Sequence, residues 1–316
     1  MAELNPKKVR YAIIMILDEA NPDFVEYLTT LIRLFSQRGD PFETVIIANG
    51  TEALLRGKLG ELKALGVPIK CFCFHRMTAE SVCLKVGLKE SSGEMVFLTG
   101  SYQQIAEESL RALLEAMDSE TDAAIPWRQE RVDPWLNRLQ SRVFNGVVRV
   151  ITKSGLQDLS CNTRIFRRRV LEEIEVYGGM FRFLPILASM KGYRNLEVKC
   201  RHFQERGKKG FYGFSDYVTR IVEIFTLFFN LRFTRKPLRF FNILGAIFLV
   251  FGLSAFVYVF VQKTIWGVPI GGRPVLLLGI LFMVIGAQAA SVGLLAEIVA
   301  FTHGRHKRDN LVEKII

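Results

Sequence analysis

Two long uncharged stretches near the C-terminal end place the strongest constraint on how this chain folds. The first runs from Phe240 to Val261 and the second from Pro274 to Ala296. A helix needs about 20 apolar residues to cross the hydrocarbon core of a bilayer. The sequence therefore predicts two transmembrane helices joined by a short loop. Half of the 316 residues are hydrophobic but 23% are charged, so the apolar excess is local rather than general.

Basic residues crowd the outer ends of this helix pair, whereas the connecting loop from Gln262 to Arg273 carries only Lys263 and Arg273. The flanking basic residues are Arg232, Arg235, Lys236 and Arg239 before the pair and Arg305, Lys307 and Arg308 after it. Because Lys and Arg are enriched on cytoplasmic flanks, we expect both termini in the cytoplasm. The expected location is the inner (cytoplasmic) membrane of the cell, as a multi-pass protein.

The net charge of +11 is explained by the same clusters, since anionic headgroups attract each basic residue beside a span by about 1 kcal/mol. We therefore expect membrane lipid, and not nucleic acid, as the partner of these charges. At the other end of the chain, the apolar run Tyr11 to Leu17 is short and meets acids at Asp18 and Glu19. Such a run is no secretory signal, so the soluble part should stay cytoplasmic.

The first two hundred residues alternate short apolar runs with longer amphipathic ones, which is typical of strands joined by crossover helices in a parallel sheet. The predicted strands are Arg10 to Ile16, Glu43 to Ala48, Ile69 to Phe74, Met95 to Leu98, Asp122 to Ile125 and Asn195 to Arg201. The predicted helices are Pro22 to Ser36, Glu52 to Leu65, Ala79 to Lys89, Ile105 to Met117 and Arg167 to Val176. This α/β layout is that of nucleotide-binding domains.

Beyond Pro134 the pattern changes and predicts segments that lie near the membrane. A basic amphipathic helix reaches about Ile151, and Phe214 to Phe233 has the helical spacing of an interfacial helix. The expected organisation is an α/β domain over 1–212, amphipathic juxtamembrane helices over 213–239, two transmembrane helices over 240–301 and a basic cytoplasmic tail over 302–316.

The order of these parts and the local wording resemble the membrane-anchored family-2 glycosyltransferases of the polyprenyl-phosphate type, which include the dolichol-phosphate mannose synthases and the undecaprenyl-phosphate glucosyltransferases. The similarity is clearest at Phe181 to Tyr193 (FRFLPILASMKGY), at Thr234 to Gly245 (TRKPLRFFNILG) and at Leu281 to Glu297. The resemblance implies a GT-A (Rossmann-like) nucleotide-sugar domain, followed by interfacial helices and a two-helix transmembrane hairpin.

The family transfers a sugar from a nucleotide-sugar to a lipid phosphate. Its chemistry uses an Asp-x-Asp pair to hold Mg²⁺ or Mn²⁺ beside the departing diphosphate, and a further acid near the acceptor phosphate. The resemblance places the nucleotide at the carboxyl ends of the strands. The acidic positions of this sequence can therefore be compared with those of the family one by one.

Two positions follow the first two strands. Where the family has an Asn-Glu pair, this chain has Asp18 and Glu19, which either contact the nucleoside or provide charge at a helix N-terminus. Where the family has Asp-Asp-Gly-Ser, the aligned run is Ala48 to Thr51, so Asn49 replaces the carboxylate that reads the base. Asn49 either hydrogen-bonds a base or is a turn residue before Gly50.

The metal position follows the fourth strand. There the family's Asp-Ala-Asp-Leu-Gln aligns with Gly100, Ser101, Tyr102, Gln103 and Gln104, so both carboxylates are lost. A hydroxyl group supplies little of the anionic charge that Mg²⁺ or Mn²⁺ prefers. Glu107 and Glu108 either replace the ligands or simply begin the next helix. We expect no bound metal in this chain, although the family carries one.

The family's Gly-Asp-Phe-Arg-Leu aligns with Cys161 to Ile165, which keeps the arginine as Arg164 but replaces the catalytic acid by Asn162. Asp158 either folds back to substitute or is a solvated loop acid, and the surface preference of Asp favours the second reading. Lys208 and Lys209 lie where the family has a basic loop. Together with Arg164 they are candidates for contacting lipid phosphate or diphosphate.

Three aligned losses of acid with a retained scaffold predict a homologue with weak or no catalysis, in a lipid-linked sugar or surface-glycan pathway. Two alternatives stay open at this point. The chain is either an active transferase with a metal-poor site, in which cationic side chains offset the diphosphate charge, or a non-catalytic scaffold or partner subunit. The expected partners are membrane lipid, polyprenyl phosphate, a nucleotide-sugar, and either a second copy of the chain or a catalytic glycosyltransferase.

Overall fold

The structure is a computed structural model that describes residues 9–18, 20–129, 146, 149, 155–176, 178–203, 222, 237–267, 269 and 274–308. The chain divides into two compact units, Met1–Ile224 and Phe225–Ile316, and each is described by itself. The basic amphipathic helix expected from Pro134, the interfacial helix Phe214 to Phe233, and the residues Glu19, Lys208 and Lys209 lie outside the described part, apart from isolated positions.

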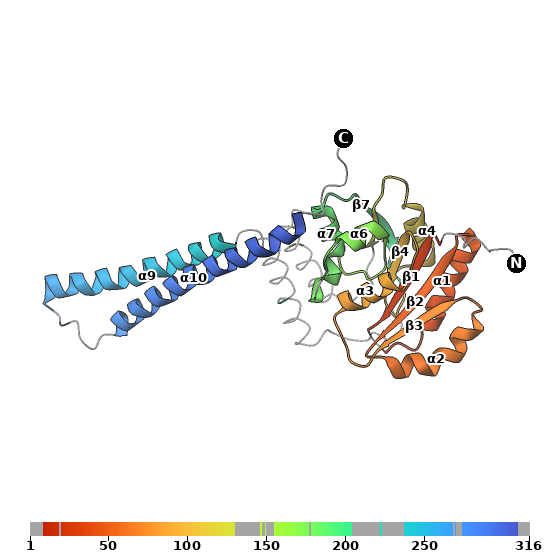
Figure 1. Cartoon of the computed structure of the whole chain (residues 1–316), viewed down its shortest axis with the longest axis horizontal. Helices are drawn as coiled ribbons and strands as arrows, with labels where there is room; N and C mark the ends of the chain where they lie inside the picture. The colour runs from red at the N-terminus through yellow and green to blue at the C-terminus, as the bar shows by residue number, and fades with distance from the viewer. Residues whose placement is uncertain are drawn as a thin grey trace. The chain divides into compact units, whose positions relative to one another are not determined.

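The first unit is built on a seven-stranded sheet with the order β3-β2-β1-β4-β6-β5-β7 (Figure 1). The strands are β1 (Tyr11–Leu17), β2 (Phe42–Asn49), β3 (Ile69–Phe74), β4 (Met95–Thr99), β5 (Ala123–Gln129), β6 (Arg164–Arg167) and β7 (Asn195–Arg201). Neighbouring strands run parallel except β6, which is antiparallel to both β4 and β5. The predicted α/β class is confirmed. The expectation of a wholly parallel sheet was wrong, because β6 was not recognised within the stretch before Arg167.

Helices cover both faces of this sheet. They are α1 (Phe24–Arg38), α2 (Glu52–Ala64), α3 (Glu80–Lys89), α4 (Glu107–Glu115), α6 (Arg168–Glu173), the 3₁₀ helix η1 (Gly178–Phe183) and α7 (Leu184–Met190). The main core cluster joins Tyr11, Ile13 and Met15 of β1 to apolar side chains of α1, α2 and α4. Because both faces are covered, all seven residues of β1 are buried.

Helix α3 packs closely against the opposite face of β1. A Cβ atom on Gly87 would lie 2.7 Å from Cγ2 of Ile14, so only glycine allows this approach. The alternating side chains of β1 therefore contact different helix layers: Ile13 belongs to the main core cluster, and Ile14 faces α3. The result is a sandwich of helices around one central sheet, in which the carboxyl ends of all strands except β6 lie along one edge.

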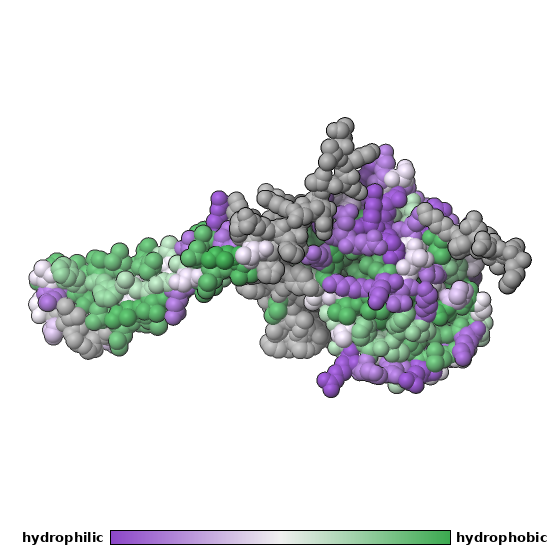
Figure 2. Space-filling view, in the orientation of Figure 1, coloured by the Kyte–Doolittle hydropathy of each residue, from purple (hydrophilic) through white to green (hydrophobic). Residues whose placement is uncertain are grey.

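The second unit contains α9 (Pro237–Trp266) and α10 (Pro274–Arg308). Two segments of these helices, Leu238–Trp266 and Pro274–Val299, are long and apolar enough to cross a membrane. Apolar side chains cover the visible faces of both helices (Figure 2), and Val250 and Leu277 are about two-thirds exposed, at 66% and 70%. Such surface is stable in lipid rather than in water. Both predicted stretches lie inside these helices.

Candidate functional site

Three of the predicted site positions meet at one edge of the sheet. Asp18 follows β1, Asn49 ends β2 and Gly100 follows β4, and these three strands are neighbours that run in parallel. Their ends lie within a few residues of one another: Thr99, the last residue of β4, pairs with Met15 of β1, and Leu17, the last residue of β1, pairs with Ala48 of β2. The prediction that Gly100 to Tyr102 lie at the end of a central strand is confirmed. In open α/β sheets this edge is where ligands bind.

The Asn49 side chain holds the loop between β3 and α3. Its Nδ2 donates to the carbonyl of Thr78 at 2.9 Å, and its Oδ1 accepts from the Thr78 amide at 2.7 Å and from the Thr78 hydroxyl at 3.2 Å. Asn49 is only 2% exposed. Both lone-pair directions of the oxygen are in use, so the remaining capacity is one N–H donor. This geometry accounts for Asn49 as a structural residue at a strand-to-helix turn.

The loop after β4 is connected to the segments beside it. Ser101 is fully buried, and its carbonyl accepts a hydrogen bond from Nδ2 of Asn21 at 3.0 Å. Gln104 accepts from the backbone amide of Asn162 through its Oε1 at 2.7 Å. A Cβ atom built on Gly100 would lie 3.4 Å from Nδ2 of Asn162. The structure therefore brings Gly100 and Asn162, two predicted site positions, to the same place.

A cluster of three buried hydroxyl groups lies where β4 ends and β6 begins. The Tyr27 hydroxyl is 2.9 Å from Oγ1 of Thr99 and 3.4 Å from Oγ1 of Thr163, and the two threonine oxygens are 3.2 Å apart. Burial raises the pKa of Tyr27 to about 12, so the phenol stays protonated at neutral pH. The sequence did not predict this cluster. Its only sequence signal is the position of Tyr27 on the apolar face of α1.

Arg164 points into the protein rather than toward the sheet edge. It is 1% exposed, and its guanidinium donates to the carbonyls of Cys161 at 2.8 Å, Leu159 at 2.8 Å and Phe181 at 3.3 Å. Burial lowers the pKa of Arg164 to about 10, which still leaves it charged at neutral pH. These contacts make Arg164 a structural residue, and they lend no support to its predicted role beside a diphosphate or lipid phosphate.

Asp158 is buried, so the expectation of a solvated loop acid was wrong. Its carboxylate receives two hydrogen bonds from the Arg128 guanidinium, at 2.7 and 3.1 Å, and the two side chains are 4% and 2% exposed. It also accepts the Ser160 amide at 2.9 Å. The reason is tertiary: Arg128 is on β5, next to the loop that carries Asp158. A carboxylate held in this way is not a ready ligand for a metal ion.

The other acids that were considered as substitute ligands begin a helix, as the sequence suggested. Helix α4 starts at Glu107, and Glu107 pairs with Arg33 at 2.8 Å and with Arg111 at 3.4 Å. Among the described residues, no three His, Cys, Asp or Glu side chains gather where they could hold a metal. Gly100, Ser101 and Tyr102 offer hydroxyl and backbone oxygens but no carboxylate, so this loop does not fit Mg²⁺ or Mn²⁺.

The amino-acid sequence is similar to those of two bacterial transferases that act with polyprenyl phosphates. The chain is 24% identical over 269 residues to dodecaprenyl-phosphate galacturonate synthase of Rhizobium johnstonii, which covers 84% of this chain and 80% of the relative. It is 25% identical over 276 residues to undecaprenyl-phosphate 4-deoxy-4-formamido-L-arabinose transferase of Edwardsiella ictaluri, covering 87% and 83%. No protein-family model matches the chain.

Among solved structures, the chain resembles glucosyl-3-phosphoglycerate synthase from Mycobacterium tuberculosis in complex with Mn²⁺, uridine diphosphate and phosphoglyceric acid. The TM-score is 0.52 at 11% identity, over 70% of this chain and 78% of that chain. A second structure of that enzyme, in complex with phosphoglyceric acid, gives a TM-score of 0.50 at 12% identity over 70% and 79%. At such identities the likeness establishes the fold alone, which is the GT-A fold of glycosyltransferases.

Proposed function

We propose that this chain, a membrane-associated relative of the polyprenyl-phosphate sugar transferases with a GT-A fold, binds a nucleotide-sugar and has weak or no metal-dependent transfer activity. The pathway would be one of lipid-linked sugars or surface glycans. One observation carries the proposal: the loop Gly100 to Tyr102 lies at the ligand edge of a retained scaffold, yet it offers no carboxylate to a metal.

The sheet edge supports nucleotide binding through groups that need no metal. Asp18 is half-buried after β1 and offers carboxylate oxygens to ribose hydroxyls. The carboxyl ends of β1, β2 and β4 form the crevice in which open α/β sheets hold nucleotides. Glu19 is proposed for the same contact on the sequence alone. Asn49 would contribute at most one N–H to a base, since its other capacity is used by Thr78.

The alternative of an active transferase needs a replacement for the missing charge. Catalysis of sugar transfer requires stabilisation of the departing diphosphate, by a metal or by cationic side chains. Arg164, the cation that the alternative of an active enzyme relied on, is bonded to three backbone carbonyls in the interior. Lys208 and Lys209 remain candidates on the sequence alone. The geometry therefore favours weak catalysis over an active transferase.

The hairpin of α9 and α10 would anchor the protein where a polyprenyl phosphate is found. We propose that both helices span the inner membrane, with both termini and the α/β domain on the cytoplasmic side, because of the asymmetry of basic residues. We also propose, from the sequence, domain limits at residues 212, 239 and 301. The same proposal includes an association with a second copy of the chain or with a catalytic transferase.

Titration calorimetry on the full-length protein in detergent tests the proposal. A panel of UDP- and GDP-sugars is titrated with and without Mn²⁺, and transfer to undecaprenyl phosphate is assayed in parallel. We expect binding of at least one nucleotide-sugar, with Mn²⁺ changing the affinity by much less than the tenfold that corresponds to about 1.4 kcal/mol. Absence of any nucleotide binding would favour a scaffold, whereas strong Mn²⁺ dependence or rapid transfer would contradict the proposal.

A gain-of-function variant sharpens this test. The double change of Gly100→Asp and Tyr102→Asp restores two carboxylates and should create Mn²⁺-dependent nucleotide binding. Space is available at Gly100, because its Cβ would make an ordinary contact of 3.4 Å with Asn162. The matched control is Gly100→Asn with Tyr102→Asn, which has nearly the same shape without the charge. If both double variants respond equally to Mn²⁺, the charge argument fails.

A further inference from the structure

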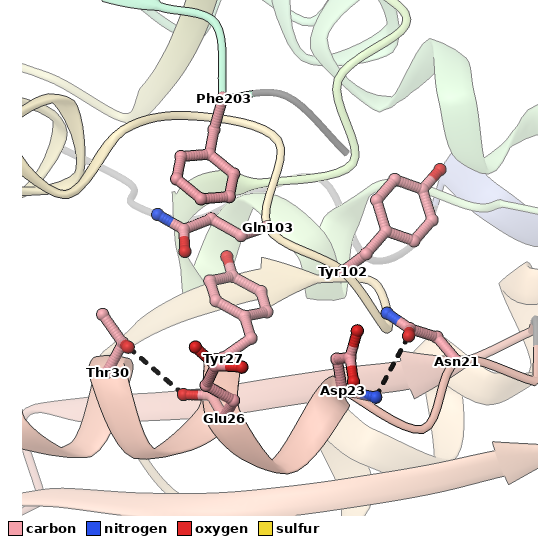
Figure 3. Close-up of a pocket in the computed structure, with 8 residues that line it drawn as sticks. All are labelled: Asn21, Asp23, Glu26, Tyr27, Thr30, Tyr102, Gln103 and Phe203. Atoms are coloured by element: carbon pink, nitrogen blue, oxygen red, sulfur yellow. Dashed lines mark hydrogen bonds between the residues drawn. The ribbon is translucent and has the colours of Figure 1, made fainter. Parts of the chain in front are cut away.

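The pocket beside α1 shows how polar side chains are accommodated in the α/β domain (Figure 3). It is lined by the start of α1, the loop after β4, and Phe203 after β7. There Oδ1 of Asn21 accepts a hydrogen bond from the Asp23 amide at 3.1 Å, and the Thr30 hydroxyl donates to the Glu26 carbonyl at 3.2 Å. Asp23 and Glu26 are exposed, so water reaches their carboxylates. A polar side chain inside a membrane has no water to contact and needs a polar partner in the protein.

One polar side chain lies near the middle of α10, in the segment that is proposed to cross the membrane. This segment, Pro274–Val299, has 26 residues and is therefore about 39 Å long. Gln288 lies about 2 Å from its middle along the helix axis, which is the depth of the hydrocarbon core. The Gln288 side chain is exposed and makes no hydrogen bond to any residue that the structure describes.

Two serines in the apolar segments solve the same problem within their own helix. The Ser254 hydroxyl donates to the carbonyl of Phe251 at 2.8 Å, and the Ser291 hydroxyl donates to the carbonyl of Ala287 at 3.1 Å. Gln288 has no such bond among the described residues, so its carboxamide is left facing lipid. A carboxamide in hydrocarbon is unfavourable unless another polar group meets it.

Gln288 lies on the side of α10 that faces away from α9. Glycines on the other side approach α9 closely, since a Cβ on Gly286 would lie 2.8 Å from the carbonyl oxygen of Gly245. Successive residues of a helix are about 100° apart, so Gln288 is about 200° around the axis from Gly286. Its own face carries exposed apolar side chains, which are those of Leu281, Val284 and Leu295. Helix α9 therefore cannot be the partner of Gln288.

The chemistry of this face identifies the partner as a second copy of the chain. Acyl chains carry no donor or acceptor, and lipid phosphates lie at the membrane surface rather than at its middle. A carboxamide carries both donors and an acceptor, so two copies of the Gln288 side chain are complementary to each other. Ala287 and Ser291 beside it are small and exposed, which lets a second helix approach closely.

We infer that two copies of the chain associate in the membrane through this face of α10, with their Gln288 side chains hydrogen-bonded to each other. Both copies insert in the same direction, so the two-fold axis is parallel to the membrane normal and brings the same residue of each copy together at the same depth. The inference rests on the part of the proposed function that places α9 and α10 across the membrane, and it does not depend on nucleotide binding.

Energy transfer between donor-labelled and acceptor-labelled copies tests the association. The full-length protein is labelled at the exposed thiols of Cys71 and Cys73 and reconstituted in vesicles of phosphatidylethanolamine and phosphatidylglycerol, which are then diluted with lipid. We expect energy transfer in the unaltered protein. Gln288→Met, which keeps an unbranched, flexible side chain but loses the amide, should raise the protein-to-lipid ratio at half association by at least about fivefold. Leu277→Met, at a 70% exposed position of the same face, is the matched control and should leave this ratio unchanged.

Disulfide cross-linking locates the contact on the helix surface. In a background of Cys71→Ser with Cys73→Ser, the variant Ser291→Cys places a thiol one turn from Gln288. Oxidation with copper phenanthroline in the same vesicles should then cross-link two copies, and adding Gln288→Met should weaken the cross-link. Val250→Cys, at a 66% exposed position of α9, is the control and should stay monomeric.

The outcomes separate this inference from the proposed membrane span. Carbonate extraction of the vesicles shows whether the protein is inserted. If carbonate removes the protein, the proposed span fails and the inference fails with it. If the protein stays inserted but shows no energy transfer, or transfer that Gln288→Met leaves unchanged, the inference is overturned while the span stands. Cross-linking at Val250→Cys in place of Ser291→Cys would also overturn it, because the contact would then lie on α9.

Discussion

The buried ion pair between Asp158 and Arg128 allows a sharp test of what Asp158 does. If it is structural, Asp158→Asn removes a charge whose partner stays buried. The two side chains are 4% and 2% exposed and are joined by hydrogen bonds of 2.7 and 3.1 Å. Breaking such a pair by removing one partner costs about 3–5 kcal/mol. Because asparagine keeps an acceptor for the Ser160 amide, we expect the lower end, about 3 kcal/mol.

Urea unfolding of the full-length protein in detergent measures this loss. Trp127 precedes Arg128 on β5, so tryptophan fluorescence includes a probe beside the pair. The control is Glu120→Gln, which breaks the ion pair between Glu120 and Arg194. Both of these side chains are exposed, Arg194 at 62% and Glu120 at 71%. An exposed pair contributes about 0–1 kcal/mol. Arg128→Met alone leaves the Asp158 carboxylate buried without its partner, whereas in the Asp158→Asn background it leaves no buried charge. Arg128→Met should therefore lower the free energy of unfolding by at least about 2 kcal/mol less in that background than it does alone.

Two results would refute the reasoning. Asp158→Asn would be no more destabilising than Glu120→Gln if the pair were solvated in solution. Alternatively, the variant would keep its stability but lose Mn²⁺-dependent nucleotide binding if Asp158 had taken over the missing metal position. Either outcome would also remove one of the observations that support weak catalysis.

Three further predictions concern other parts of the molecule. Burial raises the pKa of Tyr27 from 10.0 to about 12. Between these two pH values the unfolded chain loses the phenol proton while the folded chain keeps it, so the free energy of unfolding falls by up to about 1.4 kcal/mol per pH unit. Urea titrations over this pH range should show a shallower fall for Tyr27→Phe. In the hairpin, a Cβ on Gly286 would lie 2.8 Å from the carbonyl oxygen of Gly245. Gly286→Leu should therefore destabilise the hairpin by about 1–3 kcal/mol and lower the midpoint of thermal unfolding in detergent. Val250→Leu, at a position that is 66% exposed, is the control and should leave the midpoint unchanged. With the chain's own exposed thiols replaced by serine, Lys263→Cys should resist an impermeant maleimide in vesicles that present their cytoplasmic face; rapid labelling there would reverse the proposed topology.

Much of the fold could be predicted from the sequence because it depends on local patterns. The run Ile69–Phe74 was predicted with the bounds that β3 has, and Asn195–Arg201 with those of β7. The two apolar stretches that are long enough to cross a membrane are recognisable from length and missing charge alone. Strand β6 was missed because it has four residues, Arg164–Arg167, and too short a run shows no period.

The sequence by itself determined the alternation of strands and helices, the two apolar spans and the absence of acids at Gly100 to Tyr102, since each is written in consecutive residues. Only the tertiary structure decided what the remaining charged groups do. Arg128 and Asp158 are 30 positions apart, and the carbonyls around Arg164 come from two segments. The pocket at Phe203 joins three segments. No local period encodes such meetings, because burial and pairing between distant residues depend on how the sheet and its loops close around them.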